Sequence, residues 1–340
     1  LGAVAGVGAA SLAGCSAGVR ESPDPVTLAE TTPEDDSSYA SVYERTIGSV
    51  VFVGDESGGG SGFVYEDVVV TNHHVVRDAE SMNVRFEGGE WRSGGVTATD
   101  VYADLAVVST DIPEYAAPLS LVEQVPPVGT EVLALGSPFG LESSVSVGIV
   151  SGKNRSLPNE QTGFSIPNTV QTDAGLDPGN SGGPLITMDG EVTGVAVAGA
   201  GTSVGFAVSP LLARRVLPEL IENGQYDHPF LGIRLLEVTP AIAEANDLDE
   251  PRGVLVVETS DTPAGRTLRG VTGEANVDGR AVPVGGDVLV ELAGEAIDSS
   301  ADLGTTLALS LSPGDRVPAT IIRDGERRDV MLSIGARPTP

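Results

Sequence analysis

The sequence of 340 residues contains a single cysteine, Cys15, which excludes internal disulfide bonds and metal sites built from cysteines. Histidine is almost as rare, with His73 and His74 adjacent and His228 standing apart. Adjacent side chains do not normally converge on one ion, so we expect no metal site and no other cofactor. After the N-terminal segment no apolar run reaches the roughly 18 residues of a membrane-spanning helix, so we expect none in the body of the chain.

Positive charge is scarce as well. There are 19 Lys and Arg residues, with Lys153 the only lysine, against 48 Asp and Glu residues, and the net charge is −29. A surface this negative repels phosphates, which excludes nucleic acid as a partner. The composition resembles that of proteins from extreme halophiles such as haloarchaea, whose acidic surfaces stay soluble where salt screens self-repulsion. An ordinary acidic secreted protein is the alternative.

Residues 1–15 have the features of a signal segment rather than of a folded element. Residues 1–14 are small and apolar, and Leu-Ala-Gly-Cys at 12–15 resembles the lipobox of secreted lipoproteins. That resemblance implies that Cys15 is a lipidation site and that the protein is extracytoplasmic, anchored to the outer face of the cell membrane. An incidental cysteine in a leader is the alternative. Residues 16–37, rich in Pro, Ser, Thr and acids, are expected to form an acidic, disordered tether.

Short valine-rich runs broken by Gly, Pro, Asn or Asp follow the tether. The strands expected from them cover 49–54, 62–71, 105–110, 130–135, 144–150 and 191–198. Short strands at this spacing favour an all-β barrel or sandwich. Helical periodicity appears at 210–223, where the apolar residues fall on one side and Gly224 stands at the C-terminal stop.

A second, strand-dominated unit is expected after Gly224. Its strands are predicted at 230–235, 253–258, 287–292, 316–323 and 328–334, and its helices at 240–246 and 300–311. The last two strands are joined by a turn that contains Asp324 and Gly325, a strong hairpin signal.

The strongest chemical signal is Asp-Pro-Gly-Asn-Ser-Gly-Gly-Pro-Leu at 177–185. Flanking glycines leave the hydroxyl of Ser181 clear of neighbouring side chains. The turn Gly179, Asn180, Ser181 lets the N–H groups of Gly179 and Ser181 face one point, which is the geometry of an oxyanion hole. By itself the segment is also compatible with an ordinary turn.

Two other segments supply partners for such a serine. Residues 68–76 place His73 and His74 directly after an apolar strand, and a serine hydroxyl becomes a good nucleophile when a neutral imidazole accepts its proton. Residues 102–108 place Asp104 at the start of a buried strand, where a carboxylate needs a partner such as a histidine N–H. The nearby acids Asp100 and Asp111 are alternatives to Asp104.

The order His, Asp, Ser resembles that of chymotrypsin-like proteases, and the motifs are most similar to those of the HtrA (Deg) family. The matching segments are GSGFV at 60–64, TNHHV at 71–75, DLAVV at 104–108, ALGSPFG at 134–140, GIVS at 148–151, QTDA at 171–174, GNSGG at 179–183 and VGFAV at 204–208. The resemblance covers about residues 40–338. It implies a mostly β fold, with a chymotrypsin-like double β-barrel protease domain over 38–224 followed by a C-terminal PDZ domain over 229–338.

The resemblance also implies roles for single residues. The family's catalytic histidine takes the fourth place of Thr-Asn-x-His-Val, which is His74 here, while His73 stands where asparagine is usual and its role is open. The catalytic triad implied is His74, Asp104 and Ser181. The base of the S1 pocket falls on Gly175, and its lining on Leu176, Ala200 and Val204. These positions carry no acid, so cleavage is expected after Val, Ala, Ile or similar residues.

In the PDZ-like region, the loop that binds a peptide C-terminal carboxylate corresponds to Phe230, Leu231, Gly232 and Ile233. The segments GDVL at 286–289 and SPGD at 312–315 match later turns of such domains. Residues 270–286 replace a shorter connection in family members, and this insertion is expected to alter access to the groove.

The function implied is that of an ATP-independent, extracytoplasmic serine endopeptidase that degrades unfolded or misfolded proteins and binds peptide C-termini. The alternative is a peptide-binding chaperone or scaffold with a latent or inactive protease site. An esterase is disfavoured because no Gly-x-Ser-x-Gly elbow stands in a strand–helix context. Family members form homotrimers, for which Tyr39, Val42, Tyr43 and Ile47 are candidate contacts, although these residues suit a cap on the first barrel equally well.

The charge balance predicts that stability depends on salt. If the acidic surface is a halophilic adaptation, lowering the salt from molar to millimolar concentration should lower the melting temperature, because self-repulsion is then screened over about 30 Å instead of about 3 Å. Circular dichroism melts across a salt series measure this. A melting temperature that does not change with salt would favour an ordinary acidic secreted protein.

Overall fold

A computed structural model describes residues 38–55, 58–137, 144–159, 161–177, 179–197 and 204–338. The lipobox with Cys15, the tether at 16–37 and the S1 residue Ala200 therefore lie outside the described residues. Within the described ranges no helix is long and apolar enough to cross a membrane.

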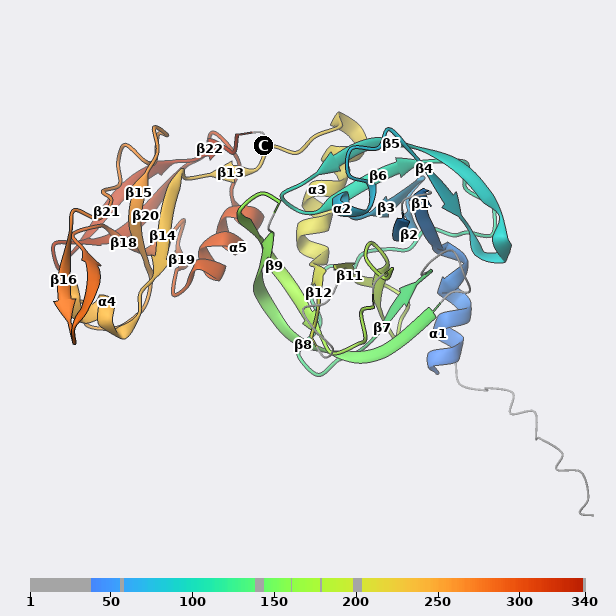
Figure 1. Cartoon of the computed structure of the whole chain (residues 1–340), viewed down its shortest axis with the longest axis horizontal. Helices are drawn as coiled ribbons and strands as arrows, with labels where there is room; N and C mark the ends of the chain where they lie inside the picture. Colours follow the sequence, from blue (N-terminus) through green and yellow to red (C-terminus); the bar gives the residue numbers. More distant parts are fainter. Residues whose placement is uncertain are drawn as a thin grey trace, which may run out of the picture. The chain divides into compact units, whose positions relative to one another are not determined.

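Residues 50–109 form a closed barrel with strand order β1-β2-β3-β6-β5-β4 (Figure 1). Its strands are β1 (Val50–Asp55), β2 (Gly58–Tyr65), β3 (Val68–Thr71), β4 (Ser81–Arg85), β5 (Trp91–Asp100) and β6 (Leu105–Ser109). Short helical segments are inserted at α2 (His73–Val76) and η2 (Glu87–Gly89). Every pairing in this barrel is antiparallel.

The valine run of β3 explains how the barrel is buried. Val69 belongs to a cluster formed within the first barrel, whereas Val68 and Val70 belong to a larger cluster shared with the second barrel. Successive side chains of a strand point to opposite faces. A strand with both faces buried therefore needs consecutive apolar residues instead of an alternating pattern.

A second closed barrel follows, with strand order β10-β11-β12-β9-β8-β7. Its strands are β7 (Glu131–Gly136), β8 (Ser144–Asn159), β9 (Phe164–Thr172), β10 (Pro184–Thr187), β11 (Val192–Val197) and β12 (Gly205–Val208). The double β-barrel expected from the sequence is thus confirmed.

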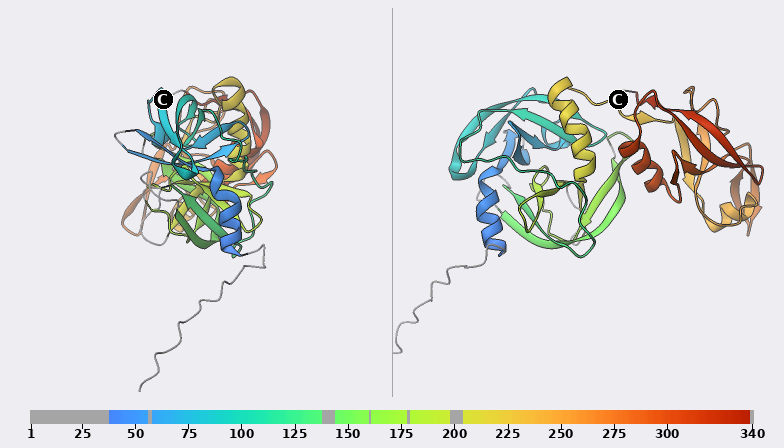
Figure 2. Two further views of the ribbon diagram at one scale, coloured as in Figure 1. Left: turned by 90° about the vertical axis from the view of Figure 1, so that its right-hand side faces the viewer. Right: turned by 180° about the vertical axis from the view of Figure 1, so that it is seen from behind.

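Two helices complete the shared core. Helix α3 (Pro210–Asn223) begins at the cap Ser209, ends at Gly224, and lies across both barrels (Figures 1 and 2). Helix α1 (Tyr39–Thr46) and η1 (Ile47–Ser49) bring Val42 and Ile47 into the same core, where they are 0% and 7% exposed. These two side chains therefore cap the barrels.

Residues 229–338 form what we call the C-terminal sheet, with strand order β14-β15-β18-β20-β21 and β19 paired to β18. Its strands are β14 (Ile233–Glu237), β15 (Val254–Thr259), β18 (Val288–Leu292), β19 (Glu295–Ala296), β20 (Arg316–Arg323) and β21 (Glu326–Ser333). Two small sheets pair β13 (Pro229–Phe230) with β22 (Gly335–Ala336), and β16 (Gly273–Val277) with β17 (Arg280–Val284). Helix α5 (Ser300–Ser310) packs on one face through Leu303, and α4 (Pro240–Ala245) on the other through Ile242.

Four segments differ from the strands expected. The prediction of one strand at 230–235 is wrong, because the chain turns at Gly232, which has a left-handed φ of 71°, and forms β13 and β14 in different sheets. The prediction of a single strand at 62–71 is wrong. The chain turns at Glu66, which has a left-handed φ of 50°, and forms the two paired strands β2 and β3. The strand predicted at 144–150 is too short. In the structure β8 continues to Asn159 and forms a long, bulged ribbon with β9. The insertion at 270–286 contains the hairpin β16–β17. The Asp324–Gly325 turn is as expected, with φ of 55° and 76°.

One fully buried charge stands at the centre of the C-terminal sheet. Asp287 is 0% exposed and accepts hydrogen bonds from Arg323 Nε and Nη2, both at 2.6 Å, and from the Arg269 N–H at 2.8 Å. The bond to Asp287 raises the pKa of Arg323 above its usual value. A buried carboxylate is tolerated only when it is paired in this way.

Arg323→Ala should therefore lower the free energy of unfolding by about 3–5 kcal/mol, because it leaves Asp287 buried and without its charge partner. Urea unfolding followed by circular dichroism at fixed salt measures this. Arg266→Ala is the matched control, since the Arg266–Asp261 ion pair is exposed and its removal should leave stability unchanged. Equal stability of the two variants would contradict the prediction.

Candidate active site

His74 lies at the point where the first barrel turns from β3 into α2. Its Nδ1 is 2.7 Å from Asp104 Oδ2, and its backbone N–H donates to Asp104 Oδ1 at 3.0 Å. The His74 side chain is 31% exposed and that of Asp104 is 7% exposed. When Nδ1–H is donated to the carboxylate, Nε2 is left as the proton acceptor of the ring.

Asp104 is held in an unusual backbone conformation. It ends the turn between β5 and β6 with φ of 54°, a left-handed value that is unfavourable for residues other than glycine. Its carbonyl accepts a hydrogen bond from Asn72 Nδ2 at 2.7 Å. Both the carboxylate and the main chain of Asp104 are therefore held by the segment that carries His74.

The alternative residues do not take part in this contact. His73 Nδ1 is buried and has no hydrogen-bond partner among the described residues. Asp100 pairs with His228 Nε2 at 2.7 Å, and the Asp111 carboxylate lies 3.8 Å from Arg92 Nε. Of the two histidines and three acids that the sequence offered, His74 and Asp104 are the pair that the structure brings together.

Ser181 lies in the loop before β10 and is 6% exposed. Its carbonyl accepts the Ser61 N–H at 2.7 Å. The Ser61 hydroxyl donates to the Gly179 carbonyl at 2.6 Å and accepts the Ser137 N–H at 2.8 Å. Gly182 has φ of 85°, and a Cβ there would lie 2.2 Å from the Ser61 carbonyl, so only glycine allows this approach.

The sequence predicts that the N–H groups of Gly179 and Ser181 serve as donors for an oxyanion. Within the described residues, no backbone hydrogen bond uses either group. The N–H of Asn180, by contrast, already donates to the Asp177 carbonyl at 3.0 Å, and the Asn180 side chain is buried, with Nδ2 3.4 Å from the Gly175 carbonyl. Asn180 therefore supports the loop rather than offering a free donor.

A cavity of about 440 Å³ is lined by His74, Gly179 and Ser181 together. No hydrogen bond joins the Ser181 hydroxyl to His74 among the described residues, as is common when no substrate is bound. A serine, an oriented imidazole and two free N–H groups at one cavity are the parts needed for acyl transfer.

The expected S1 residues are partly described. Gly175 is exposed and faces Ser146, whose Oγ would lie 3.4 Å from a Cβ at position 175. Leu176 packs close to Gly205, the residue after Val204. A Cβ at position 205 would lie 2.6 Å from Leu176 Cδ1. Leu176 and Val204 are thus brought near each other.

A groove beside the C-terminal sheet is shared with the second barrel, because Phe164, Ser165 and Pro167 of β9 line it as well. A cavity of about 430 Å³ is lined by Leu231, Gly232 and Ile233 before and along β14, and by Leu303 and Leu307 of α5. The Ser260 and Thr262 hydroxyls donate to the carbonyls of Gly232 and Leu231 at 2.8 and 2.6 Å. Gly232 has φ of 71°, which lets its loop turn between these two hydroxyls.

Sequence reasoning missed the supporting roles of Ser61 and Asn72. Both stand inside motifs that carried the family resemblance, Gly-Ser-Gly-Phe-Val and Thr-Asn-His-His-Val, and that was the only available signal. Their partners, Gly179 and Asp104, lie 118 and 32 residues away, so spacing alone does not reveal the contacts.

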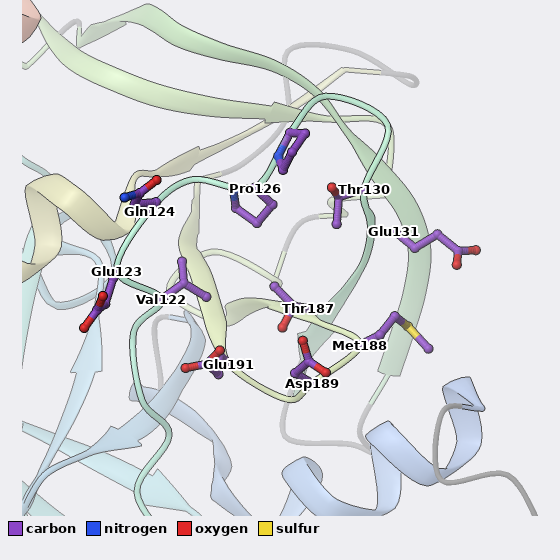
Figure 3. A pocket seen from close by; sticks show the side chains of 11 residues that line it. Val122, Glu123, Gln124, Pro126, Thr130, Glu131, Thr187, Met188, Asp189 and Glu191 are labelled. Atoms are coloured by element: carbon purple, nitrogen blue, oxygen red, sulfur yellow. The ribbon is translucent and has the colours of Figure 1, made fainter.

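Another cavity, of about 460 Å³, lies on the second barrel (Figure 3). Its acidic lining residues are Glu123, Glu131, Asp189 and Glu191, and no basic residue lines it. In the described part of the chain no group of three or more His, Cys, Asp or Glu side chains is arranged to hold a metal ion. The absence of a metal cofactor stays a prediction.

Comparison with known proteins gives a match to the trypsin-like peptidase domain over residues 60–195. A curated relative from Pseudomonas fulva, named "Probable periplasmic serine endoprotease DegP-like", is 35% identical over 82% of this chain and 56% of its own length. A relative of the same name from Halomonas elongata is 33% identical over the same shares. The chain thus spans about half the length of these curated relatives.

Solved structures are similar over a larger share. The HtrA-type protease AlgW with a tripeptide matches with a TM-score of 0.70 and 27% identity, over 89% of this chain and 98% of AlgW. AlgW with a decapeptide matches with a TM-score of 0.69 and 25% identity. The likeness therefore includes the C-terminal sheet as well as the two barrels.

The contact of Ser61 with Gly179 predicts that Ser61→Ala lowers kcat of peptide hydrolysis about 10- to 100-fold, because the Gly179 carbonyl loses its donor and the loop with the oxyanion donors loosens. Steady-state kinetics on a fluorogenic peptide measure this. Ser49→Ala is the matched control, since Ser49 is another buried serine whose hydroxyl donates to a carbonyl, that of Ala117. The prediction is wrong if both variants keep wild-type kcat.

Proposed function

Because the chain belongs to the HtrA/DegP family of serine proteases with a trypsin-like domain, we propose that it is a serine endopeptidase that degrades unfolded or misfolded proteins without ATP. The observation that carries this proposal is the 2.7 Å contact between His74 Nδ1 and Asp104 Oδ2, beside a cavity that also holds Ser181.

The proposed chemistry follows from this geometry. The Ser181 hydroxyl attacks the scissile carbonyl while His74 Nε2 takes its proton, and His74 then returns the proton to the leaving amine. The Asp104 carboxylate keeps the ring in the required tautomer and stabilises the imidazolium. The N–H groups of Gly179 and Ser181 stabilise the developing oxyanion, and losing one such donor costs about 2.7–4 kcal/mol of transition-state stabilisation.

For the S1 pocket we propose a preference for small aliphatic residues such as Val, Ala and Ile. Gly175 contributes no side chain, and Leu176 and Val204 are aliphatic. No carboxylate stands at these positions to pair with a Lys or Arg side chain. Ala200, the remaining proposed lining residue, lies outside the described residues.

For the C-terminal sheet we propose a PDZ domain that binds peptide C-termini. The groove between β14 and α5 supports this, because a peptide can add as a strand to β14 while its carboxylate lies at the loop of Phe230, Leu231, Gly232 and Ile233. Among the described residues β14 pairs with β15 alone, so its other edge forms no strand pairing, and residues of β9 line the groove beside it. The similar structures of AlgW are of that protease with a decapeptide and with a tripeptide.

A chaperone or scaffold with a latent protease site remains the second candidate. One observation favours it: the Ser181 hydroxyl is not hydrogen-bonded to His74 in the described residues. The triad side chains are nevertheless all present, so latency would be a matter of geometry.

For assembly and location we propose a homotrimer outside the cytoplasm, anchored through Cys15. The names of the relatives, which include the word periplasmic, support the location. Of the four expected trimer contacts, Val42 and Ile47 are buried in the core, whereas Tyr39 is 41% exposed. Tyr39 is therefore the member of this group best placed to meet a neighbouring subunit. A salt-adapted, haloarchaeal character is likewise proposed from the charge balance.

Digestion of unfolded casein in high salt tests the function. Wild type should cleave it and Ser181→Ala should not, because the variant lacks the nucleophile while its fold, checked by circular dichroism, is intact. Mass spectrometry of the fragments should show Val, Ala and Ile at the cleaved positions. No cleavage by either protein would favour the scaffold, and equal cleavage by both would show that Ser181 is not the nucleophile. A profile dominated by Arg and Lys would refute the S1 assignment.

A further inference from the structure

A second buried His–Asp pair lies outside the proposed triad. His228 Nε2 and Asp100 Oδ2 are 2.7 Å apart, and their side chains are only 9% and 5% exposed. The two residues are 128 positions apart in the sequence. The proposed mechanism gives neither of them a role.

The carboxylate of Asp100 also closes the turn that carries Asp104. Its second oxygen, Oδ1, accepts the Ala103 N–H at 2.7 Å. Asp100 and Asp104 thus stand at the two ends of one short turn. The same turn is held by Asn159, whose Nδ2 donates to the Val101 carbonyl at 2.8 Å.

His228 is itself fixed on several sides. It belongs to the segment that runs from the end of α3 to β13, the first strand of the C-terminal region. Its ring meets those of Tyr226 and Tyr102 edge-on, with centroid distances of 4.7 and 5.4 Å. Its carbonyl accepts the Arg337 N–H at 2.8 Å.

The turn needs such support because of its backbone. Asp104 has φ of 54°, a conformation that costs free energy and persists only when the surroundings enforce it. Both oxygens of the Asp104 carboxylate are engaged by His74. A small movement of the turn would therefore break the contact that orients the imidazole.

We propose that His228 is a positioning residue: by binding Asp100 it holds the turn that carries Asp104, and thereby keeps His74 oriented for catalysis. The inference rests on the proposed triad of His74, Asp104 and Ser181. It makes the segment that enters the C-terminal sheet part of the catalytic assembly.

Two amide variants that differ by one methylene group test this. In His228→Gln the side-chain amide nitrogen, Nε2, is separated from Cβ by the same number of bonds as Nε2 of histidine. The glutamine can therefore still donate to Asp100. In His228→Asn the amide lies at the position of Nδ1 and falls short. Thr305→Ala is the matched control, because Thr305 bonds Asn154 and joins the C-terminal sheet to β8 without touching the turn.

Kinetics are measured in high salt on an internally quenched peptide with valine at the scissile position, and kcat is taken per site titrated with a fluorophosphonate. His228→Asn should lower kcat about 10- to 100-fold, as expected for a displacement on the order of 1 Å, with KM changed less than about 2-fold. His228→Gln and Thr305→Ala should stay within about 3-fold of wild type.

The proposal is overturned if folded His228→Asn keeps wild-type kcat, or if His228→Gln and His228→Asn lose activity equally. If His228→Asn fails to fold, Asn159→Ala is the second variant, because it loosens the same turn without leaving a buried charge. Wild-type kcat in Asn159→Ala would equally overturn the proposal. Failure of the proposed function is recognised separately, because Ser181→Ala would then match wild type, or wild type itself would be inactive.

Discussion

The carboxylate of Asp104 sets the main constraint on this protein. Its side chain is 7% exposed, and a charge removed from water in this way must be paired or it destabilises the fold. Two hydrogen bonds from His74 provide that pairing, and Asn72 holds the backbone of the same residue. The segment after β3 and the turn before β6 must therefore meet at a fixed distance, and the first barrel is built so that they do.

The two barrels supply the rigidity that this contact needs. Valine runs such as that of β3 are buried on both faces, one toward the first barrel's own cluster and one toward the core shared with the second barrel and α3. The serine loop belongs to the second barrel, yet Ser61 of the first barrel holds it through Gly179 and through the Ser181 carbonyl. The proposed nucleophile and the proposed base are thus placed by one continuous packing arrangement.

Buried charges in the rest of the molecule follow the same rule. Asp287 is fully buried against Arg323, and Asp100 is buried against His228. Burial lowers the pKa of Arg337 below its usual value, and its guanidinium lies 4.6 Å from the ring centres of both Tyr102 and Phe164. In a chain with only 19 basic residues against 48 acidic ones, several arginines are committed to such interior contacts. The surface is left strongly acidic.

The sequence by itself determined part of the fold, because hydrophobic periodicity, helix caps and turn residues act locally: α3 and β20 have the expected bounds. It also indicated the chemistry, since the Gly-Asn-Ser-Gly-Gly segment is typical of a serine nucleophile. The hairpin hidden in residues 62–71 and the length of β8 were not predictable, since apolar runs look alike on either side of a turn and a bulged ribbon has no simple period. Only the tertiary structure decided which histidine reaches which acid. Successive side chains of α2 point about 100° apart, so His74 faces Asp104 while His73 does not. His228 lies 128 residues from Asp100 in the sequence, and packing, not spacing, brings the two together.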